Sequence, residues 1–226
     1  VLFVGGYWAV PHRHRLSVLG IASLLFYGFW NWRYLPLLLL VSLAAWGIGH
    51  WANKKQRSTL SFSIFVFLLF VPLIVFKYWD WIAENIELLS SILSFSLSMP
   101  SRQDYGIILP VGISFFTFQA VSYVIDTKRN GQEEKNPWRF FTFIAFFPQL
   151  IAGPIVRREE LLPQLRRPLL LNKGDTSAAL FRITKGMVKK LLIADVLYNS
   201  IIDQVFKDPS TYIGIELWVA LYAYTI

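Results

Sequence analysis

The stretch STLSFSIFVFLLFVPLIVF, residues Ser58–Phe76, has 19 residues and contains no Lys, Arg, Asp or Glu. A helix of about 20 apolar residues spans the hydrocarbon core of a bilayer, which is roughly 30 Å thick. An amphipathic helix of a soluble protein would instead carry charged residues along its outer face. This stretch therefore predicts a transmembrane helix.

Four other windows of similar length also lack charged residues: Leu16–Trp32, Tyr34–Gly49, Tyr105–Ile125 and Phe140–Val156. The 226 residues are 55% hydrophobic and 17% aromatic, which exceeds the usage of ordinary globular domains. Several such windows cannot be one signal peptide, because a signal peptide has a single short apolar region near the N-terminus. We expect an all-α, polytopic transmembrane helical protein.

The basic residues predict the orientation of these helices, because Lys and Arg accumulate in cytoplasmic loops. Three basic clusters lie between windows: Arg13 with Arg15, Lys54–Arg57 and Lys128–Arg139. The stretch Lys77–Asp104 holds more acidic than basic residues, so we place it on the outer, periplasmic face. The net charge of +8 is thus explained by basic residues that flank the predicted membrane segments. We therefore expect no nucleic-acid partner.

Two amphipathic stretches predict helices that lie in the membrane interface. In the outer loop, apolar residues recur at helical spacing from Ile82 to Leu97, next to Tyr78 and Trp79. Aromatic rings of this kind suit the headgroup layer. The second stretch follows Lys185, and Asp195 is expected on its polar side.

The window Phe140–Val156 does not fit a simple crossing. A full crossing would place nine basic residues, between positions 157 and 190, on the outer face. Pro148, Gly153 and Pro154 also interrupt a straight helix. We expect a broken or re-entrant segment that enters from the cytoplasm and returns to it. Non-helical backbone at membrane depth needs polar partners from the protein or from a water-filled cavity.

Five residues are candidates for lining a substrate tunnel or funnel near this segment. Gln119 and Gln149 each place an amide within an apolar window, where it either bonds a neighbouring helix or lines a polar path. Gly153 and Pro154 belong to the broken backbone. Arg157 could meet an anionic donor at the cytoplasmic mouth, although a basic residue there also follows from ordinary topology.

The residues by themselves define no catalytic centre. His12 and His14 lie in a basic cluster and His50 ends an apolar window, and no two of them have metal-ligand spacing. Gly112–Ser114 begins like a nucleophile elbow, but Phe116 stands where the second glycine belongs. The chain also has no cysteine. We expect no metal site and no bound cofactor.

Four longer motifs are distributed along the chain, from Ser23 to Phe206. They are SLLFYGFWNW at Ser23–Trp32, LPVGISFFTFQAVSYVID at Leu109–Asp126, FFPQLIAGPIVRREELLPQL at Phe146–Leu165 and GMVKKLLIADVLYNSIIDQVF at Gly186–Phe206. The chain resembles the membrane-bound O-acyltransferase family, and most closely its bacterial branch of alginate O-acetylation proteins.

This resemblance implies a multi-pass enzyme of the bacterial inner membrane. It implies transfer of an acetyl group from a thioester donor such as acetyl-CoA to hydroxyls of an exported polysaccharide such as alginate. The implied partners are the lipid bilayer, the donor, the polysaccharide and periplasmic acetyltransferases. A related branch transfers D-alanine to teichoic acid. A transporter or flippase remains an alternative, because discontinuous helices also build transport sites.

The resemblance also implies an intramembrane histidine as general base, in a region beyond the LYAYTI terminus. His12, His14 and His50 do not correspond to it. We therefore expect no catalytic residue in this chain. We also expect that residues 1–226 are the incomplete N-terminal and central part of one domain, truncated at both ends.

Overall fold

The computed structural model describes residues 2–53, 58–93, 95, 98–102, 104, 106–151, 153–167 and 172–225. These described residues are predominantly helical and include no strand, which confirms the all-α prediction. The chain divides into two compact units, Val1–Leu169 and Leu170–Ile226. The expectation of a single incomplete domain concerns the whole protein and remains a prediction.

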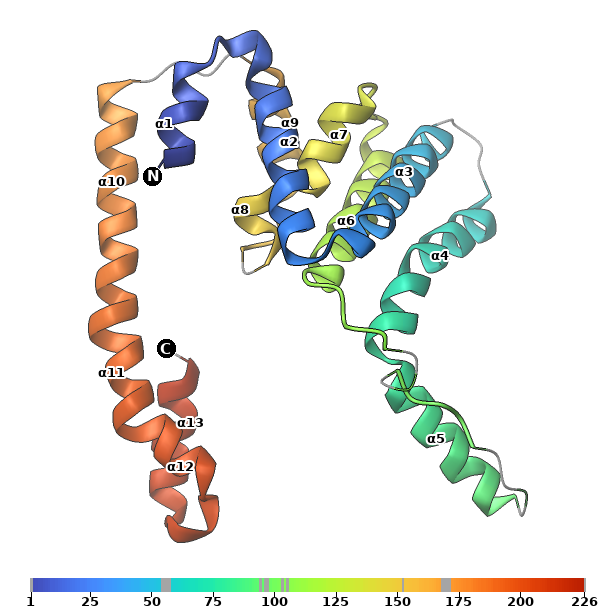
Figure 1. Ribbon diagram of the computed structural model, residues 1–226, viewed down its shortest axis with the longest axis vertical. Coiled ribbons are helices and arrows are strands. Elements are labelled where there is room, and N and C mark those ends of the chain that lie inside the picture. The colour runs from blue at the N-terminus through green and yellow to red at the C-terminus, as the bar shows by residue number, and fades with distance from the viewer. Residues whose placement is uncertain are drawn as a thin grey trace. The chain divides into compact units, whose positions relative to one another are not determined.

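The first unit begins with helices that follow the apolar windows (Figure 1). They are α1 (Leu2–Ala9), α2 (His12–Asn31), η1 (Trp32–Tyr34), α3 (Leu35–Ala52), α4 (Thr59–Lys77) and α5 (Trp79–Ile92). The run His12–Ala52 and the helix Thr59–Lys77 are long and apolar enough to cross a membrane. Among the described residues these are the two candidate spans. The first of them includes two predicted windows, because the chain turns at η1.

The later part of the first unit contains α6 and three shorter helices. They are α6 (Ile113–Asn130), α7 (Pro137–Ile144), α8 (Phe147–Leu150) and α9 (Arg158–Arg166). The window Tyr105–Ile125 is therefore helical only in its second part. Pro110 and the left-handed Gly112, with φ of +72°, delay the start of the helix. It ends at Gly131, which adopts the left-handed conformation common at helix C-termini.

Helix α5 corresponds to the predicted interfacial helix but is shorter than expected. It ends at Ile92, and Leu97 lies outside the described residues. The start of α5 is held by the following loop, since Asp80 forms an ion pair of 2.7 Å with Arg102. Hydrogen bonds from the backbone N–H and the guanidinium of Arg102 lower the pKa of Asp80. A position in the membrane interface remains a prediction.

Helix α6 lies at the centre of the core of the first unit. Ile113, Phe116, Ala120 and Val124 recur at helical spacing on α6 and are buried. Helices α3 and α4 pack against α6. Helix α3 approaches closely at Gly49, where a Cβ atom would lie 2.6 Å from the Tyr123 ring. Small residues permit this kind of close helix packing in membranes.

Polar contacts join one end of this core to the loop that precedes α6. The Tyr34 hydroxyl donates to the carbonyl oxygen of Ile108 at 2.6 Å. The Lys77 ammonium donates to the Ser114 hydroxyl at 3.3 Å. Tyr34 and Lys77, from two separate helical elements, therefore both lie near the start of α6.

The second unit is built on one long helical run. Its parts are α10 (Lys173–Val188), the π-helical η2 (Lys189–Ala194), α11 (Asp195–Leu197), the π-helical η3 (Tyr198–Ile202) and α12 (Asp203–Lys207). The short η4 (Pro209–Thr211) leads to α13 (Gly214–Thr225), which packs against η3. Asp195 accepts a hydrogen bond from Lys190 at 2.7 Å on the exposed side of the run. The predicted helix is thus present, and its interfacial position remains a prediction.

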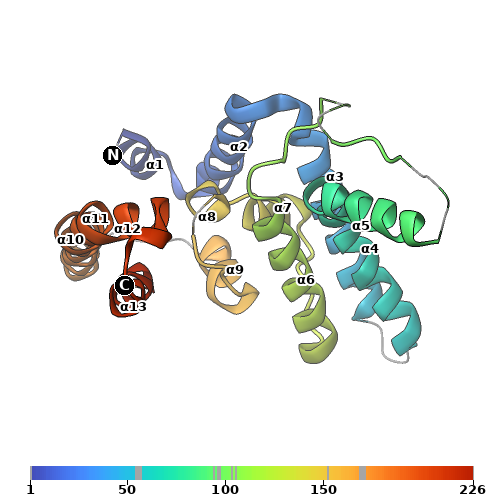
Figure 2. The same ribbon diagram turned by 90° about the horizontal axis from the view of Figure 1, so that it is seen from below.

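Gly112 allows α8 to pack directly against the start of α6. A Cβ atom at Gly112 would lie 2.4 Å from the carbonyl oxygen of Leu150, which is shorter than any ordinary contact. Helix α8 also packs against α2, and the two helices are seen next to each other in Figure 2. Both the positive φ and this contact require glycine.

We predict that Gly112→Ala lowers the free energy of unfolding more than Gly106→Ala. Gly106 also has a positive φ, of +62°, but a Cβ atom there would meet nothing within 4 Å. Backbone strain should cost about 1–2 kcal/mol in both variants, and the added clash about 1–3 kcal/mol more in Gly112→Ala. Unfolding in detergent measures the free energy of unfolding of each variant. Equal decreases in the two variants would contradict the packing of α8 on α6.

Candidate functional site

The segment Phe140–Val156 is broken, as its sequence predicts. Helix α7 starts at Pro137, with the Asn136 side chain accepting a hydrogen bond from Arg139 N. It ends at Ile144 because Pro148 has no N–H for the Ile144 carbonyl and its ring would crowd that oxygen. The short α8 follows. Re-entry into the membrane remains a prediction.

Gly153 closes a tight turn at the end of α8. Its backbone N–H donates to the carbonyl oxygen of Gln149 at 3.0 Å. A Cβ atom at Gly153 would lie 2.4 Å from the Cα atom of Gln149, so no larger residue fits. The chain then runs without regular structure through Pro154 to Arg157, and both of these residues are exposed.

Two buried amides connect the broken segment to α6. Gln119 Nε2 donates to the carbonyl oxygen of Phe143 at 3.0 Å. Gln149 Nε2 donates to Gln119 Oε1 at 2.9 Å, and it also lies 3.3 Å from the same carbonyl. The carbonyls in the last turn of a helix lack partners within the helix, so these amides supply one where α7 ends. Their interhelical hydrogen bonds stabilise the break.

One polar atom of this pair has no partner. Gln149 is 6% exposed, and its Oε1 atom is buried without a hydrogen-bond partner in the described part of the chain. A buried oxygen without a partner is costly, so its retention calls for a reason beyond helix packing. The predicted pair of amides is thus brought together, and a role in lining a tunnel remains a prediction.

The remaining candidates lie at the edge of this site. Gly153 adjoins Gln149, whereas Pro154 and Arg157 are exposed. The buried basic residue is the next one, Arg158, which is 6% exposed. Two adjacent arginines look alike in a sequence, and only packing decides which one turns inward.

Arg158 fastens the start of α9 to the end of α6. Its Nη1 atom donates to the Thr127 hydroxyl at 2.9 Å and to the carbonyl oxygen of Gln132. Its Nη2 atom lies 3.3 Å from Gln132 Oε1. The buried guanidinium therefore has several oxygen partners, which a buried charge requires.

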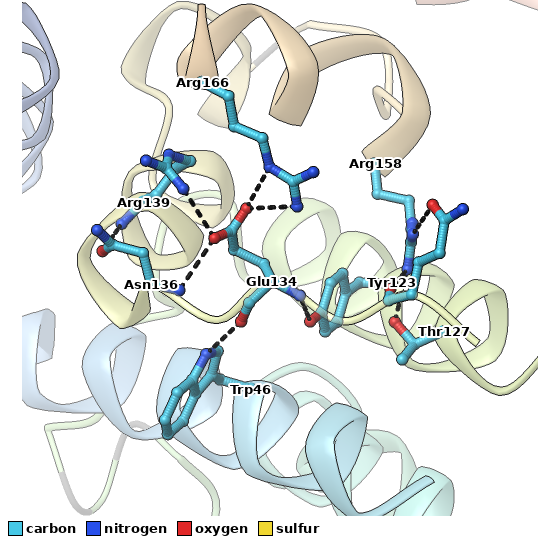
Figure 3. Close-up of polar contacts among 9 residues, drawn as sticks. Trp46, Tyr123, Thr127, Glu134, Asn136, Arg139, Arg158 and Arg166 are labelled. Carbon is cyan, nitrogen blue, oxygen red and sulfur yellow. Dashed lines mark hydrogen bonds and ion pairs between the residues drawn. The ribbon is translucent and has the colours of Figure 1, made fainter. Parts of the chain in front are cut away.

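Glu134 forms a second buried polar cluster beside Arg158 (Figure 3). Its side chain is 2% exposed and pairs with Arg139 at 2.9 Å and with Arg166 at 2.8 Å. Its carboxylate also accepts a hydrogen bond from the backbone N–H of Asn136 at 2.9 Å. These four residues are called the Glu134 cluster below. The cluster joins the loop before α7, α7 itself and the end of α9.

The backbone of Glu134 extends these contacts to two more helices. Its N–H donates to the Tyr123 hydroxyl at 2.9 Å, and its carbonyl accepts from Trp46 Nε1 at 2.7 Å. Glu134 and Arg158 were not among the site residues predicted from the sequence. The available signal was a pair of acids, Glu133 and Glu134, in an otherwise basic loop.

The histidines have positions that fit structural roles. His50 is half-buried, and its Nδ1 atom lies 2.9 Å from the carbonyl oxygen of Trp46, so Nδ1 is the donor. His12 and His14 are exposed at the start of α2. Among the described residues, no three His, Cys, Asp or Glu side chains gather as metal ligands would.

We predict that Glu134→Gln lowers the free energy of unfolding by about 2–3 kcal/mol, because it leaves two arginines without their buried partner. The loss should be below the upper range for buried pairs, since Arg166 is half exposed. Glu133→Gln, at the half-buried neighbouring position, should cost no more than about 0.5 kcal/mol. Equal losses in the two variants would contradict a special role for the Glu134 cluster.

The sequence of the chain is similar to those of several known proteins. The chain is 34% identical over 229 aligned residues to "Probable alginate O-acetylase AlgI" of Azotobacter vinelandii, which covers 99% of the chain and 44% of that protein. The Pseudomonas aeruginosa protein of the same name is 33% identical over 99% of the chain and 43% of its own length. The "Peptidoglycan O-acetyltransferase" of Helicobacter pylori is 32% identical over 77% of the chain and 37% of its own length.

The two alginate O-acetylases match 99% of the chain and confirm the resemblance drawn from its motifs. The chain spans less than half the length of the alginate O-acetylases that it matches. No family model matches the chain. No solved structure matches it either. On its similarity to the alginate O-acetylases, the chain belongs to the membrane-bound O-acyltransferase family.

Proposed function

We propose that the protein containing this chain transfers an acetyl group from a thioester donor, such as acetyl-CoA, to hydroxyls of an exported polysaccharide such as alginate. The observation that carries the proposal is the similarity, over 99% of the chain, to proteins named as alginate O-acetylases. In the reaction, a hydroxyl oxygen attacks the thioester carbonyl while a base takes the hydroxyl proton. The C–S bond then breaks, and the donor leaves as a thiol.

The general base in this proposal is a histidine outside residues 1–226. His50 is bonded to the Trp46 carbonyl, and His12 and His14 are exposed among arginines. A general base must instead lie within hydrogen-bond reach of the proton that it removes. The relatives contain more than twice the length that this chain spans, which leaves room for such a residue.

The contribution of this chain is the wall of the reaction tunnel around the broken segment. Gln149 Oε1 offers a buried acceptor to a substrate hydroxyl or to an amide of the donor. Gln119 and Gly153 hold the Gln149 side chain and backbone in place. Exclusion of water from this site would protect the thioester from hydrolysis.

We infer a multi-pass position in a bacterial inner membrane, with the basic clusters in the cytoplasm. The two apolar candidate spans support it. Arg13, Arg139 and Arg166 come from separate basic stretches and line one pocket. An acceptor that is exported would meet the acyl group from the periplasmic side, where acetyltransferase partners would receive it.

Transfer of D-alanine to teichoic acid is a second candidate, because it uses the same attack of a hydroxyl on a thioester. It rests on a match of 37% identity over 59 residues, or 26% of the chain, to the "Teichoic acid D-alanyltransferase" of Lacticaseibacillus rhamnosus. The alginate O-acetylases match far more of the chain, so acetyl transfer has the stronger support. A transporter or flippase has less support, since these relatives are all named for acyl transfer.

We predict that Gln149→Leu in the complete protein lowers the rate of acetyl transfer by about tenfold or more, a loss of roughly 1.4 kcal/mol or more of transition-state stabilisation. The assay follows labelled acetyl groups from acetyl-CoA to polysaccharide in membranes. Gln119→Leu is the matched control, because it removes the same amide pairing but keeps Gln149 Oε1. Its rate should fall less, while folded protein falls equally in both variants.

Two results would contradict these proposals separately. If both variants lose rate only in proportion to folded protein, the amides merely pack helices and Gln149 lines no tunnel. If the complete unmodified protein transfers nothing from acetyl-CoA while it remains folded in membranes, the proposed reaction is wrong. Residues 1–226 alone should be inert, because they lack the expected base.

We predict that reporter fusions after Gly131 and after Ser98 give opposite signals in bacterial cells. The first position follows basic residues that belong in the cytoplasm, and the second lies in the acidic outer loop. A fusion after Arg167 should match the one after Gly131 if the broken segment is re-entrant. Matching signals after Gly131 and Ser98 would overturn the orientation, and a periplasmic signal after Arg167 would overturn re-entry.

A further inference from the structure

A basic pocket of about 290 Å³ lies between the starts of α2 and α7 and the end of α9. The basic side chains that line it come from three separate parts of the first unit. They are His12, Arg13, Arg15, Arg139, Arg166 and Arg167. Among the described residues that line this pocket, none is acidic.

The positive charge of the pocket is only partly neutralised. Arg139 and Arg166 share the single carboxylate of Glu134. Arg15 Nε donates a hydrogen bond to the carbonyl oxygen of Val10 at 3.0 Å, and the Arg15 guanidinium lies over the Trp8 ring. Arg13 and Arg167 are exposed at the rim. The pocket as a whole therefore attracts anions.

A second pocket, of about 430 Å³, has an apolar lining. Phe3 and Val4 of α1 lie on one side of it. The start of α8, with Phe147 and Pro148, and Leu161 of α9 lie on the other. Phe3 and Phe147 meet edge to face, with ring centroids 5.0 Å apart.

The two pockets adjoin each other and share four lining residues. Tyr7, Leu19, Gln164 and Leu165 line both of them. A single ligand can therefore place an anionic group among the arginines and an apolar chain against α1 and α8. Neither a purely polar anion nor an uncharged hydrocarbon would use both surfaces.

We propose that these pockets bind one anionic phospholipid of the cytoplasmic leaflet. Its phosphate contacts Arg13 and Arg167, and one of its acyl chains lies along the apolar pocket. Guanidinium groups pair with phosphate oxygens through two parallel hydrogen bonds. Basic pockets between membrane helices on the cytoplasmic side suit lipid headgroups of this charge. Gln149 lines neither pocket, although its neighbours Phe147 and Pro148 line the apolar one. The lipid proposal rests on the proposed cytoplasmic position of the arginines and not on acetyl transfer.

The test measures lipid binding to the complete protein in detergent by native mass spectrometry. Dioleoylphosphatidylglycerol should bind at least about tenfold more tightly than dioleoylphosphatidylcholine, because a positively charged choline group is repelled by the arginines. Arg13→Gln with Arg167→Gln should abolish this preference. Arg13→Lys with Arg167→Lys should keep most of it, because the charge remains.

The control variant separates the pocket from net charge. Arg129→Gln with Arg182→Gln removes two exposed arginines outside the basic pocket and lowers the net charge equally. It should leave the preference for phosphatidylglycerol unchanged. Val4→Trp tests the apolar pocket, because it fills that space without altering charge. It should weaken phosphatidylglycerol binding, while Val4→Ile should not.

Competition identifies the source of the phosphate. Coenzyme A and inorganic phosphate, added at the concentration of the lipid, should fail to displace phosphatidylglycerol, because neither has the acyl chain. Displacement by coenzyme A that requires Arg13 and Arg167 would show a donor site and overturn the proposal. Equal binding of the two lipids, or an equal effect of the control variant, would also overturn it.

Discussion

Burying the carboxylate of Glu134 requires that several cationic and polar groups surround it, and the arrangement of the first unit follows from that requirement. A charge removed from water is tolerated only when partners satisfy its oxygens. Arg139 and Arg166 supply them, so α7 and α9 must both reach the loop that carries Glu134. The backbone of the same residue bonds Trp46 and Tyr123, which adds α3 and α6.

The broken segment also requires hydrogen-bond partners for polar groups that are buried. Pro148 prevents α7 from continuing, and the polar groups freed by the break need partners away from water. Gln119 and Gln149 provide side-chain amides at this point. Gly112 and Gly153 remove the side chains that would otherwise keep α8 away. The break is thus stabilised by neighbouring elements and has one buried acceptor left over.

These two polar centres lie in a structure that otherwise exposes many large apolar side chains. Arginines gather at one end, where they line a pocket beside the Glu134 cluster. The buried amides lie at the break in the chain. The homology to alginate O-acetylases supplies the chemistry that the side chains of this chain do not.

The helical class, the break between Phe140 and Val156 and the family could all be predicted from the sequence. Each depends on features that are local in the chain: uncharged length, proline and glycine positions, and continuous motifs. The late start of α6, the pairing of Gln119 with Gln149 and the burial of Arg158 in place of Arg157 were decided by the tertiary structure. These outcomes depend on atoms far apart in the chain, such as Leu150 against Gly112, and hydrophobic periodicity carries no information about them. Glu134 shows the physical reason most clearly, because a glutamate in a basic loop is ordinarily solvated and becomes buried only when separate helices bring two arginines to it.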